Sequence, residues 1–175
     1  MNYFTADYHF NHPNIIDFCG RPYKDCDHMN EGTIGRHNER VRKRDTVFHI
    51  GDFCFGGTQY ANEFLDRLNG NIILLRGNHD RRNGVRTSIE SIHIKTFGMN
   101  VLLTHRPEDA YMVRELYDFC LVGHIHEKWR FQYKMCNVGI DVWDYPVHMK
   151  QILKAYKNEY KRELRAWEER REGSK

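Results

Sequence analysis

The chain has 175 residues, is 40% apolar and carries a formal net charge of +3. A chain of this length buries about 70% of the surface that its unfolded form exposes, so wholesale disorder is excluded and one domain over residues 1–175 is favoured. No apolar stretch approaches the roughly 20 residues that span a bilayer, and the N-terminus lacks the charged-then-apolar pattern of a signal peptide. We therefore expect a cytoplasmic protein that has no membrane partner.

The patterns of cysteine and of charged residues exclude further classes of protein. The five cysteines are scattered, odd in number and without a CxxC pair, which predicts reduced thiols rather than a disulfide framework or a zinc ribbon. Basic residues cluster at 36–44 and 81–86, whereas the tail at 154–175 mixes Lys, Arg and Glu. The mixed tail predicts a solvated helix face with pairs of opposite charge.

Strands and helices alternate along the chain. In chain order we expect a strand at 2–6, helices at 13–18 and 27–42, a strand at 46–50, a helix at 58–68, strands at 71–75, 91–97 and 99–104, a helix at 108–117, strands at 119–122 and 131–138, and a C-terminal helix at about 148–169. Thr58 is expected to cap its helix, because its side-chain oxygen can accept a backbone hydrogen bond. This alternation is typical of a layered α/β or α+β domain.

Five short segments each place metal-binding or proton-handling residues directly after a predicted strand. They are Asp7-Tyr8-His9, Gly51-Asp52, Gly77-Asn78-His79-Asp80, Thr104-His105 and Gly123-His124-Ile125-His126. The residue types suit two hard-to-borderline divalent ions better than a structural zinc site. Residues two apart in an extended segment point to the same side, so Asp7 and His9 can reach one ion. Because ligands gather where strand ends meet loops, we expect the five segments to converge.

Each segment alone has an ordinary explanation. An aspartate after a strand is often a turn or cap residue, and a turn rich in Asn and Asp needs no metal. Either histidine pair alone is compatible with a structural role. The ordered series of five segments is what favours a functional site.

The series D-x-H, G-D, G-N-H-D, H and G-H-x-H, in this order across residues 7–126, resembles the calcineurin-like metallophosphoesterase superfamily. The opening segment 7–16, with Arg21-Pro22, is similar to the small single-domain bacterial and phage members. The segment around His105 departs from the wider pattern, because no glycine precedes the histidine. The resemblance implies a four-layer α/β/β/α sandwich with mixed β-sheets and a metal site at the C-terminal ends of the strands.

The resemblance also implies a cofactor of two divalent metal ions, which can be Mn, Fe, Zn or Ni, with Mn favoured. One ion would be held by Asp7, His9, Asp52 and His126, and the other by Asn78, His105 and His124, with Asp52 bridging. A hydroxide bridging the two ions would be the nucleophile. His79 would protonate the leaving oxygen or stabilise its charge, and Asp80 would orient the His79 ring.

Substrate contacts are expected near the same turns. The candidates are His12, Asn14, Arg21, Arg81 and Arg106. An arginine can hold the oxygens of a phosphate bidentately, and the first two candidates lie just beyond the first ligand segment. Surface solvation is the alternative for each.

These features predict a metal-dependent phosphoesterase, more a phosphodiesterase than a phosphomonoesterase, that acts on nucleotide or cyclic-nucleotide-like substrates. A nuclease that processes nucleic-acid ends is the alternative within the same chemistry, and it would make nucleic acid a partner. A non-catalytic metal-binding scaffold is an alternative of a different class, but a scaffold needs no His79. An oligomer through the C-terminal helix is compatible with the sequence.

Overall fold

The computed structural model describes the backbone of residues 1–172 and the side chains of residues 1–160. The last three residues of the expected domain therefore lie outside the described part, as do the side chains of the expected charged helix face beyond residue 160. Within residues 1–172, no helix combines the length and the apolar character that a membrane crossing requires.

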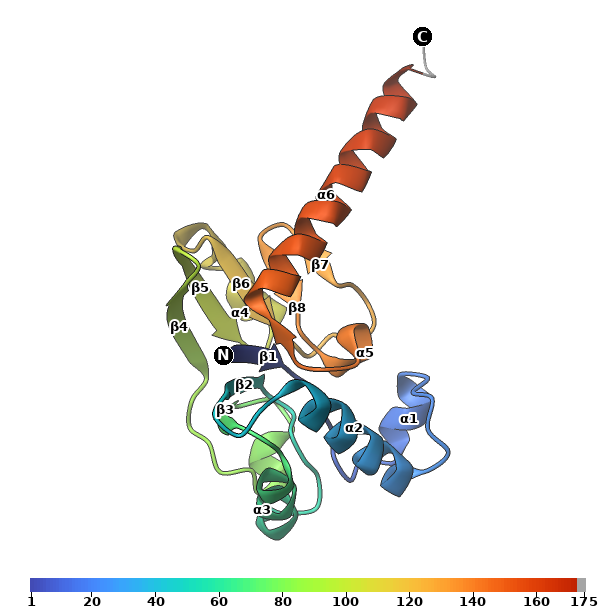
Figure 1. Cartoon of the computed structure of the whole chain (residues 1–175), viewed down its shortest axis with the longest axis vertical. Helices are drawn as coiled ribbons and strands as arrows, with labels where there is room; N and C mark the ends of the chain where they lie inside the picture. Colours follow the sequence, from blue (N-terminus) through green and yellow to red (C-terminus); the bar gives the residue numbers. More distant parts are fainter. Residues whose placement is uncertain (173–175) are drawn as a thin grey trace.

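Two mixed β-sheets form the centre of the molecule (Figure 1). The first sheet has the order β3-β2-β1-β9, in which β9 alone is antiparallel to its neighbour. Its strands are β1 (Asn2–Thr5), β2 (Thr46–Ile50), β3 (Asn71–Leu75) and β9 (Val147–His148). The second sheet has the order β4-β5-β6-β8-β7, with β5, β6 and β8 parallel. Its strands are β4 (Ser91–Thr96), β5 (Met99–Thr104), β6 (Phe119–Val122), β7 (Phe131–Gln132) and β8 (Met135–Asn137).

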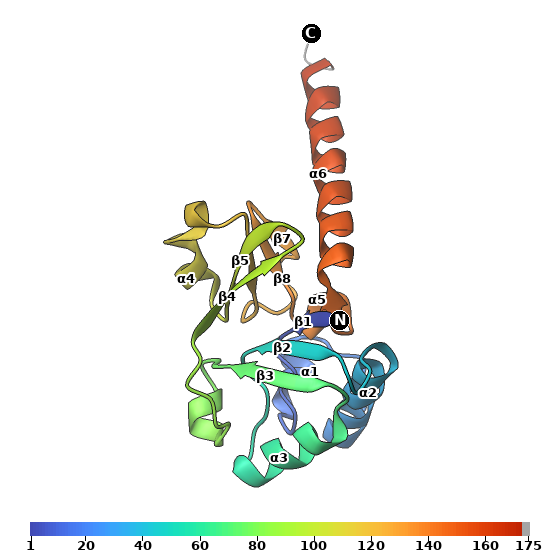
Figure 2. The same ribbon diagram turned by 60° about the vertical axis from the view of Figure 1, so that its left-hand side comes forward.

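Helices lie around the two sheets. They are α1 (Asn14–Phe18), α2 (Cys26–Arg40), α3 (Thr58–Arg67), α4 (Pro107–Tyr111), α5 (Ile140–Trp143) and α6 (Met149–Glu172), with short 3-10 turns at Asp80–Asn83 and Arg114–Leu116. The α2 and α3 helices lie against the outer face of the first sheet (Figure 2). They contribute Ile34 and Phe64 to an apolar cluster there. On the outer face of the second sheet, α4 contributes Ala110. The α6 helix extends away from both sheets (Figure 1).

The main core lies between the two sheets. Phe4, Phe48 and Ile50 of the first sheet pack in one cluster with Leu103 and Leu121 of the second. Every one of these side chains is buried, and burial of such a side chain stabilises the fold by about 1.5–3 kcal/mol. The layers are helix, sheet, sheet and helix, which confirms the expected α/β/β/α sandwich with mixed sheets.

Three expectations about local structure are wrong. The segment 131–138 is not one strand but the hairpin of β7 and β8, because Lys134 adopts a φ of +54° and reverses the chain. The segment 108–117 divides into α4 and a separate 3-10 turn. Thr58 does not cap α3. The helix cap is Gly57, and the Thr58 hydroxyl instead donates to the Gly84 carbonyl at 2.8 Å.

The short elements after β8 were not anticipated, and they join the two sheets next to the ligand segments. Ala6 pairs with Gly139 in an isolated parallel bridge, and the N–H of Ile140 donates to the Ala6 carbonyl at 3.1 Å. This pairing places the start of α5 beside the first ligand segment.

Candidate metal centre

The five ligand segments meet at one edge of the sandwich. They directly follow β1, β2, β3, β5 and β6, whose C-terminal ends share one edge within each sheet because these strands run parallel. The edges of the two sheets meet, because donor atoms from both sheets lie within 4.8 Å of one another. Three segments come from the first sheet and two from the second. The candidate site therefore forms only when the two sheets pack together.

Five of the expected ligands share a backbone conformation that is rare for residues other than glycine. Asp7, His9, Asp52, His124 and His126 have φ angles between +49° and +73°. A residue held in a sparsely populated backbone region costs about 1–3 kcal/mol, and such residues cluster at functional sites. The shared conformation singles out this edge as a place where the fold enforces side-chain direction.

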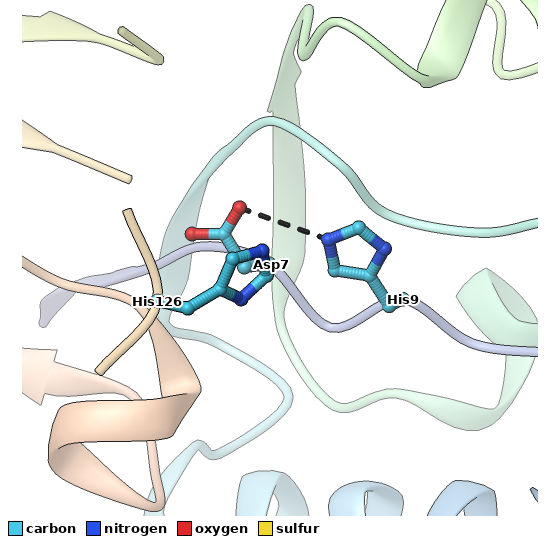
Figure 3. A group of neighbouring side chains, drawn as sticks. All are labelled: Asp7, His9 and His126. Atoms are coloured by element: carbon cyan, nitrogen blue, oxygen red, sulfur yellow. Dashed lines mark ion pairs between the residues drawn. The ribbon is translucent and has the colours of Figure 1, made fainter. Parts of the chain in front are cut away.

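The first group of donor atoms comes from Asp7, His9 and His126 (Figure 3). These atoms lie within 4.8 Å of one another, and His9 Nε2 is 4.0 Å from Asp7 Oδ1. The latter two atoms are buried, and neither has a hydrogen-bond partner among the described residues. A buried polar atom without a partner costs free energy, and one cation satisfies both atoms. The donor set fits a divalent ion.

The second group comes from Asp52, His105 and His124, whose donor atoms also lie within 4.8 Å of one another. His105 Nε2 is 3.4 Å from Asp52 Oδ2 and 3.0 Å from Asn78 Oδ1. His105 Nδ1 donates to the Ile50 carbonyl at 2.8 Å, so Nε2 is the nitrogen that faces the group. The structure thus brings His105 to the middle of the group, although its motif departs from the family pattern.

Asp52, a member of the second group, lies on the side of that group that faces the first group. Its Oδ1 accepts the backbone N–H of His79 at 2.9 Å, which fixes the carboxylate. Its Oδ2 faces His9 Nε2 at 3.7 Å on one side and His105 Nε2 at 3.4 Å on the other. This is the position that a bridging carboxylate requires.

The charges in the two groups depend on one another. Burial raises the pKa of Asp7 to about 6, and burial lowers the pKa of His9 well below its usual range. Burial also disfavours the charged forms of Asp52 and His105, but their mutual attraction outweighs it. The pKa of His105 therefore rises to about 9, and the pKa of Asp52 falls below its usual range. Positive charge beside Asp52 is stabilised in this structure.

Asp80 does not orient the His79 ring, contrary to expectation. Its buried carboxylate accepts the backbone N–H groups of Gly77, Asp52 and Phe53 at 2.6, 2.9 and 2.8 Å. Asp80 therefore ties the turn after β3 to the turn after β2. A Cβ at position 77 would overlap the backbone of Asp52, which explains the glycine in this turn.

His79 lies on the solvent side of the two groups. Its side chain is 47% exposed, and its Nε2 is 4.0 Å from Asp52 Oδ2. The centroid of its ring lies 5.7 Å from that of His9 and 5.4 Å from that of Phe55. An exposed imidazole in this position can exchange protons with water and with a bound molecule.

Arg21 is not available as a substrate contact, which corrects the expectation from sequence. The residue is only 8% exposed. Its guanidinium donates to both carboxylate oxygens of Asp141, and also to the backbone carbonyls of Asp7 and Tyr8 at 2.8 and 2.9 Å. The side chain therefore stabilises the first ligand segment from behind.

The other four expected contacts lie in different places. Arg106 lines a cavity of about 250 Å³ together with Asn78 and His105, so it borders the second group. Arg81 lines a separate cavity of about 510 Å³ with two further arginines, Arg76 and Arg86. His12 and Asn14 are at the start of α1. Asn14 is exposed, whereas His12 is half-buried, and its Nδ1 lies 3.3 Å from His9 Nδ1.

Asp141 is a site residue that the sequence reasoning missed. Its Oδ2 accepts a hydrogen bond from His126 Nδ1 at 2.7 Å. Asp141 follows β8 by four residues, so the pattern of an acidic residue after a strand was present. The expectation of one long strand at 131–138 hid it, because no turn or helix was predicted to follow.

The chain is similar to known proteins in sequence and in fold. The family model of the calcineurin-like phosphoesterase superfamily domain matches residues 26–140. An uncharacterised protein of Methanocaldococcus jannaschii is 34% identical over 163 residues, which cover 87% of this chain and 89% of that protein. The crystal structure of a protein of unknown function from Aquifex aeolicus superposes with a TM-score of 0.69 at 25% identity, covering 89% of this chain and 98% of that one.

The chain belongs to the calcineurin-like phosphoesterase superfamily. Proteins of this family are metal-dependent hydrolases of phosphate esters, and the two groups of donor atoms match that requirement. The matched region contains four of the five ligand segments and leaves out the one with Asp7 and His9.

Proposed function

We propose that this protein is a phosphodiesterase that uses two divalent metal ions, with Mn²⁺ favoured. The observation that carries the proposal is the position of Asp52, which belongs to the second group of donor atoms and also faces the first. The first group contains buried atoms that have no hydrogen-bond partner among the described residues. Asp7, His9 and His126 would hold one ion. Asn78, His105 and His124 would hold the other, and Asp52 would contact both.

Different residues of the chain have different roles in the proposed hydrolysis. When bound, the ions lower the pKa of water and neutralise charge on the phosphoryl group. The chain fixes the ligands in place through strained backbone positions and through hydrogen bonds that hold the rings of His105 and His126. Arg106 borders the cavity beside Asn78 and can bind a non-bridging phosphate oxygen. His79, on the open side, can give a proton to the leaving oxygen.

The proposal is tested by a hydrolysis screen that combines Mn²⁺, Ni²⁺, Zn²⁺ or Mg²⁺ with phosphate monoesters, linear diesters and cyclic diesters of one nucleoside. We expect Mn²⁺ to stimulate hydrolysis of the diesters more than that of the monoester. A purified protein that binds no divalent ion, or that cleaves only the monoester, would contradict the proposal.

An aromatic rim beside the site supports a substrate that carries a ring. The ring of His12 stacks on Phe55, with centroids 4.0 Å apart and planes 8° from parallel. Phe18, at the end of α1, meets the His12 ring edge-on at 6.4 Å and is 71% exposed. An exposed aromatic ring next to a phosphate site can stack on a nucleobase, which is worth about 1–3 kcal/mol per base. We therefore infer that a nucleoside group lies against this rim.

Replacing Phe18 by alanine is expected to raise KM for a nucleoside phosphodiester about tenfold, which corresponds to roughly 1.4 kcal/mol of lost binding. The KM for dimethyl phosphate, which has no ring, should not change. The measurement is steady-state kinetics on both esters.

Phe97→Ala is the matched control, because Phe97 is also exposed and also meets a histidine ring, that of His148, edge-on. Equal effects of Phe18→Ala on the two esters would contradict a stacking role.

A further inference from the structure

We propose that Asp141 and Arg21 are positioning residues that hold His126 as a metal ligand and fix the first ligand segment around the same ion. This inference rests on the proposed function, because it assigns a role toward a metal ion. It adds two residues that the ligand motifs do not contain.

The two residues form a buried ion pair behind the first group of donor atoms. Arg21 Nε donates to Asp141 Oδ1 at 2.8 Å, and Arg21 Nη2 donates to Asp141 Oδ2 at 3.0 Å. The two side chains are only 5% and 4% exposed. Two parallel hydrogen bonds between a guanidinium and a carboxylate fix the angle as well as the distance. Asp141 is therefore held in one orientation.

The fixed carboxylate determines which nitrogen of His126 is free. Asp141 Oδ2 accepts a hydrogen bond from Nδ1, which must carry a proton to donate it. Nε2 is then the nitrogen that can offer a lone pair to an ion shared with Asp7 and His9. His126 also has a φ of +49°, so its backbone alone does not favour this placement. The hydrogen bond to the Asp141 carboxylate restrains the His126 ring in this position.

The same guanidinium reaches the first ligand segment. Arg21 Nη2 donates to the carbonyl of Asp7 at 2.8 Å, and Nη1 donates to the carbonyl of Tyr8 at 2.9 Å. One ion pair thus holds both His126 and the segment that contains Asp7 and His9, which are more than 100 residues apart in sequence. No comparable contact from Arg21 or Asp141 reaches Asp52, His105 or His124 among the described residues.

This asymmetry separates a positioning role from a general structural one. A positioning role affects the ion held by the first group and leaves the ion held by the second group almost unchanged. A purely structural role changes both binding steps, or neither, together with the stability of the metal-free protein.

The test is equilibrium titration of the metal-free protein with Mn²⁺. Binding is measured by calorimetry and by the electron paramagnetic resonance signal of free Mn²⁺. Asp141→Asn is expected to weaken one of two binding steps by about 10–100-fold, as is typical when a carboxylate behind a histidine ligand is lost. The other step should change less than threefold. Asp144→Asn, the same substitution at an exposed position just after α5, is the control and should bind both ions like the wild type.

Arg21→Lys provides a second variant in case Asp141→Asn does not fold, since lysine keeps the charge but loses the two-pronged contact. It is expected to weaken the same step by at least threefold. Wild-type affinities in the folded variants, or equal weakening of both steps, would overturn the inference while leaving the proposed function intact. A wild-type protein that binds no divalent ion would overturn both, and the hydrolysis screen would fail as well.

Discussion

Asp52→Asn is expected to lower kcat/KM for phosphodiester hydrolysis by about a thousandfold, or roughly 4 kcal/mol of transition-state stabilisation. The variant keeps the oxygen that accepts the His79 N–H but places an amide NH₂ where Oδ2 now faces His9 and His105. An NH₂ group has no lone pair for a cation, so both groups of donor atoms lose a shared ligand. Because Asp52 belongs to the second group and faces the first, no other single substitution should weaken both binding steps as much.

The measurement is steady-state kinetics together with titration of Mn²⁺. Asp66→Asn, on the exposed face of α3, is the control for loss of one carboxylate. Circular dichroism should show the same secondary structure in all three proteins. Activity of Asp52→Asn within threefold of the wild type would show that the carboxylate is not a bridging ligand.

His79→Gln is expected to lower kcat by about 10²–10⁴-fold, the range that general acid catalysis contributes, for a diester with an alkyl leaving group. Its effect on a nitrophenyl ester should be much smaller, because nitrophenolate leaves without a proton. His79 borders the site from the solvent side, 47% exposed, so the substitution should leave the affinity for Mn²⁺ nearly unchanged.

The comparison of the two leaving groups separates proton transfer from phosphate binding. If His79 only binds the phosphate, the loss of kcat will be the same for both esters. His93→Gln is the control, because His93 is an exposed histidine on β4 that contacts Tyr117 rather than the site. An unchanged kcat with the alkyl ester would remove His79 from the mechanism.

Local patterns in the sequence were sufficient to predict a layered α/β domain and the meeting of the ligand segments, whereas the four-layer sandwich was implied by the family resemblance. Apolar runs mark the strands, and polar residues directly after parallel strands must lie at one edge of a sheet. His105 shows the strength of this argument. Its motif departs from the family pattern, yet its position after β5 brings it to Asn78 and Asp52.

The hydrogen-bond partners of buried side chains were not predictable in the same way. Arg21 looked like a phosphate contact because an arginine can hold phosphate oxygens, and Asp80 looked like a partner of His79 because it is the next residue in sequence. Their actual partners, Asp141 for Arg21 and three backbone N–H groups for Asp80, come from segments that only the folded chain brings close. Short elements such as α5 and β9 are also too brief to leave a periodic pattern.

Five ligand positions have a left-handed backbone conformation, which connects the stability of the protein to the concentration of the metal. The fold holds those residues in an unfavourable conformation, which lowers the free energy of unfolding. An ion that binds only the folded state adds its binding free energy to stability, in proportion to the logarithm of its concentration. On the proposed function, a cell that is short of the metal would therefore lose the protein itself through unfolding and degradation, in addition to losing its activity.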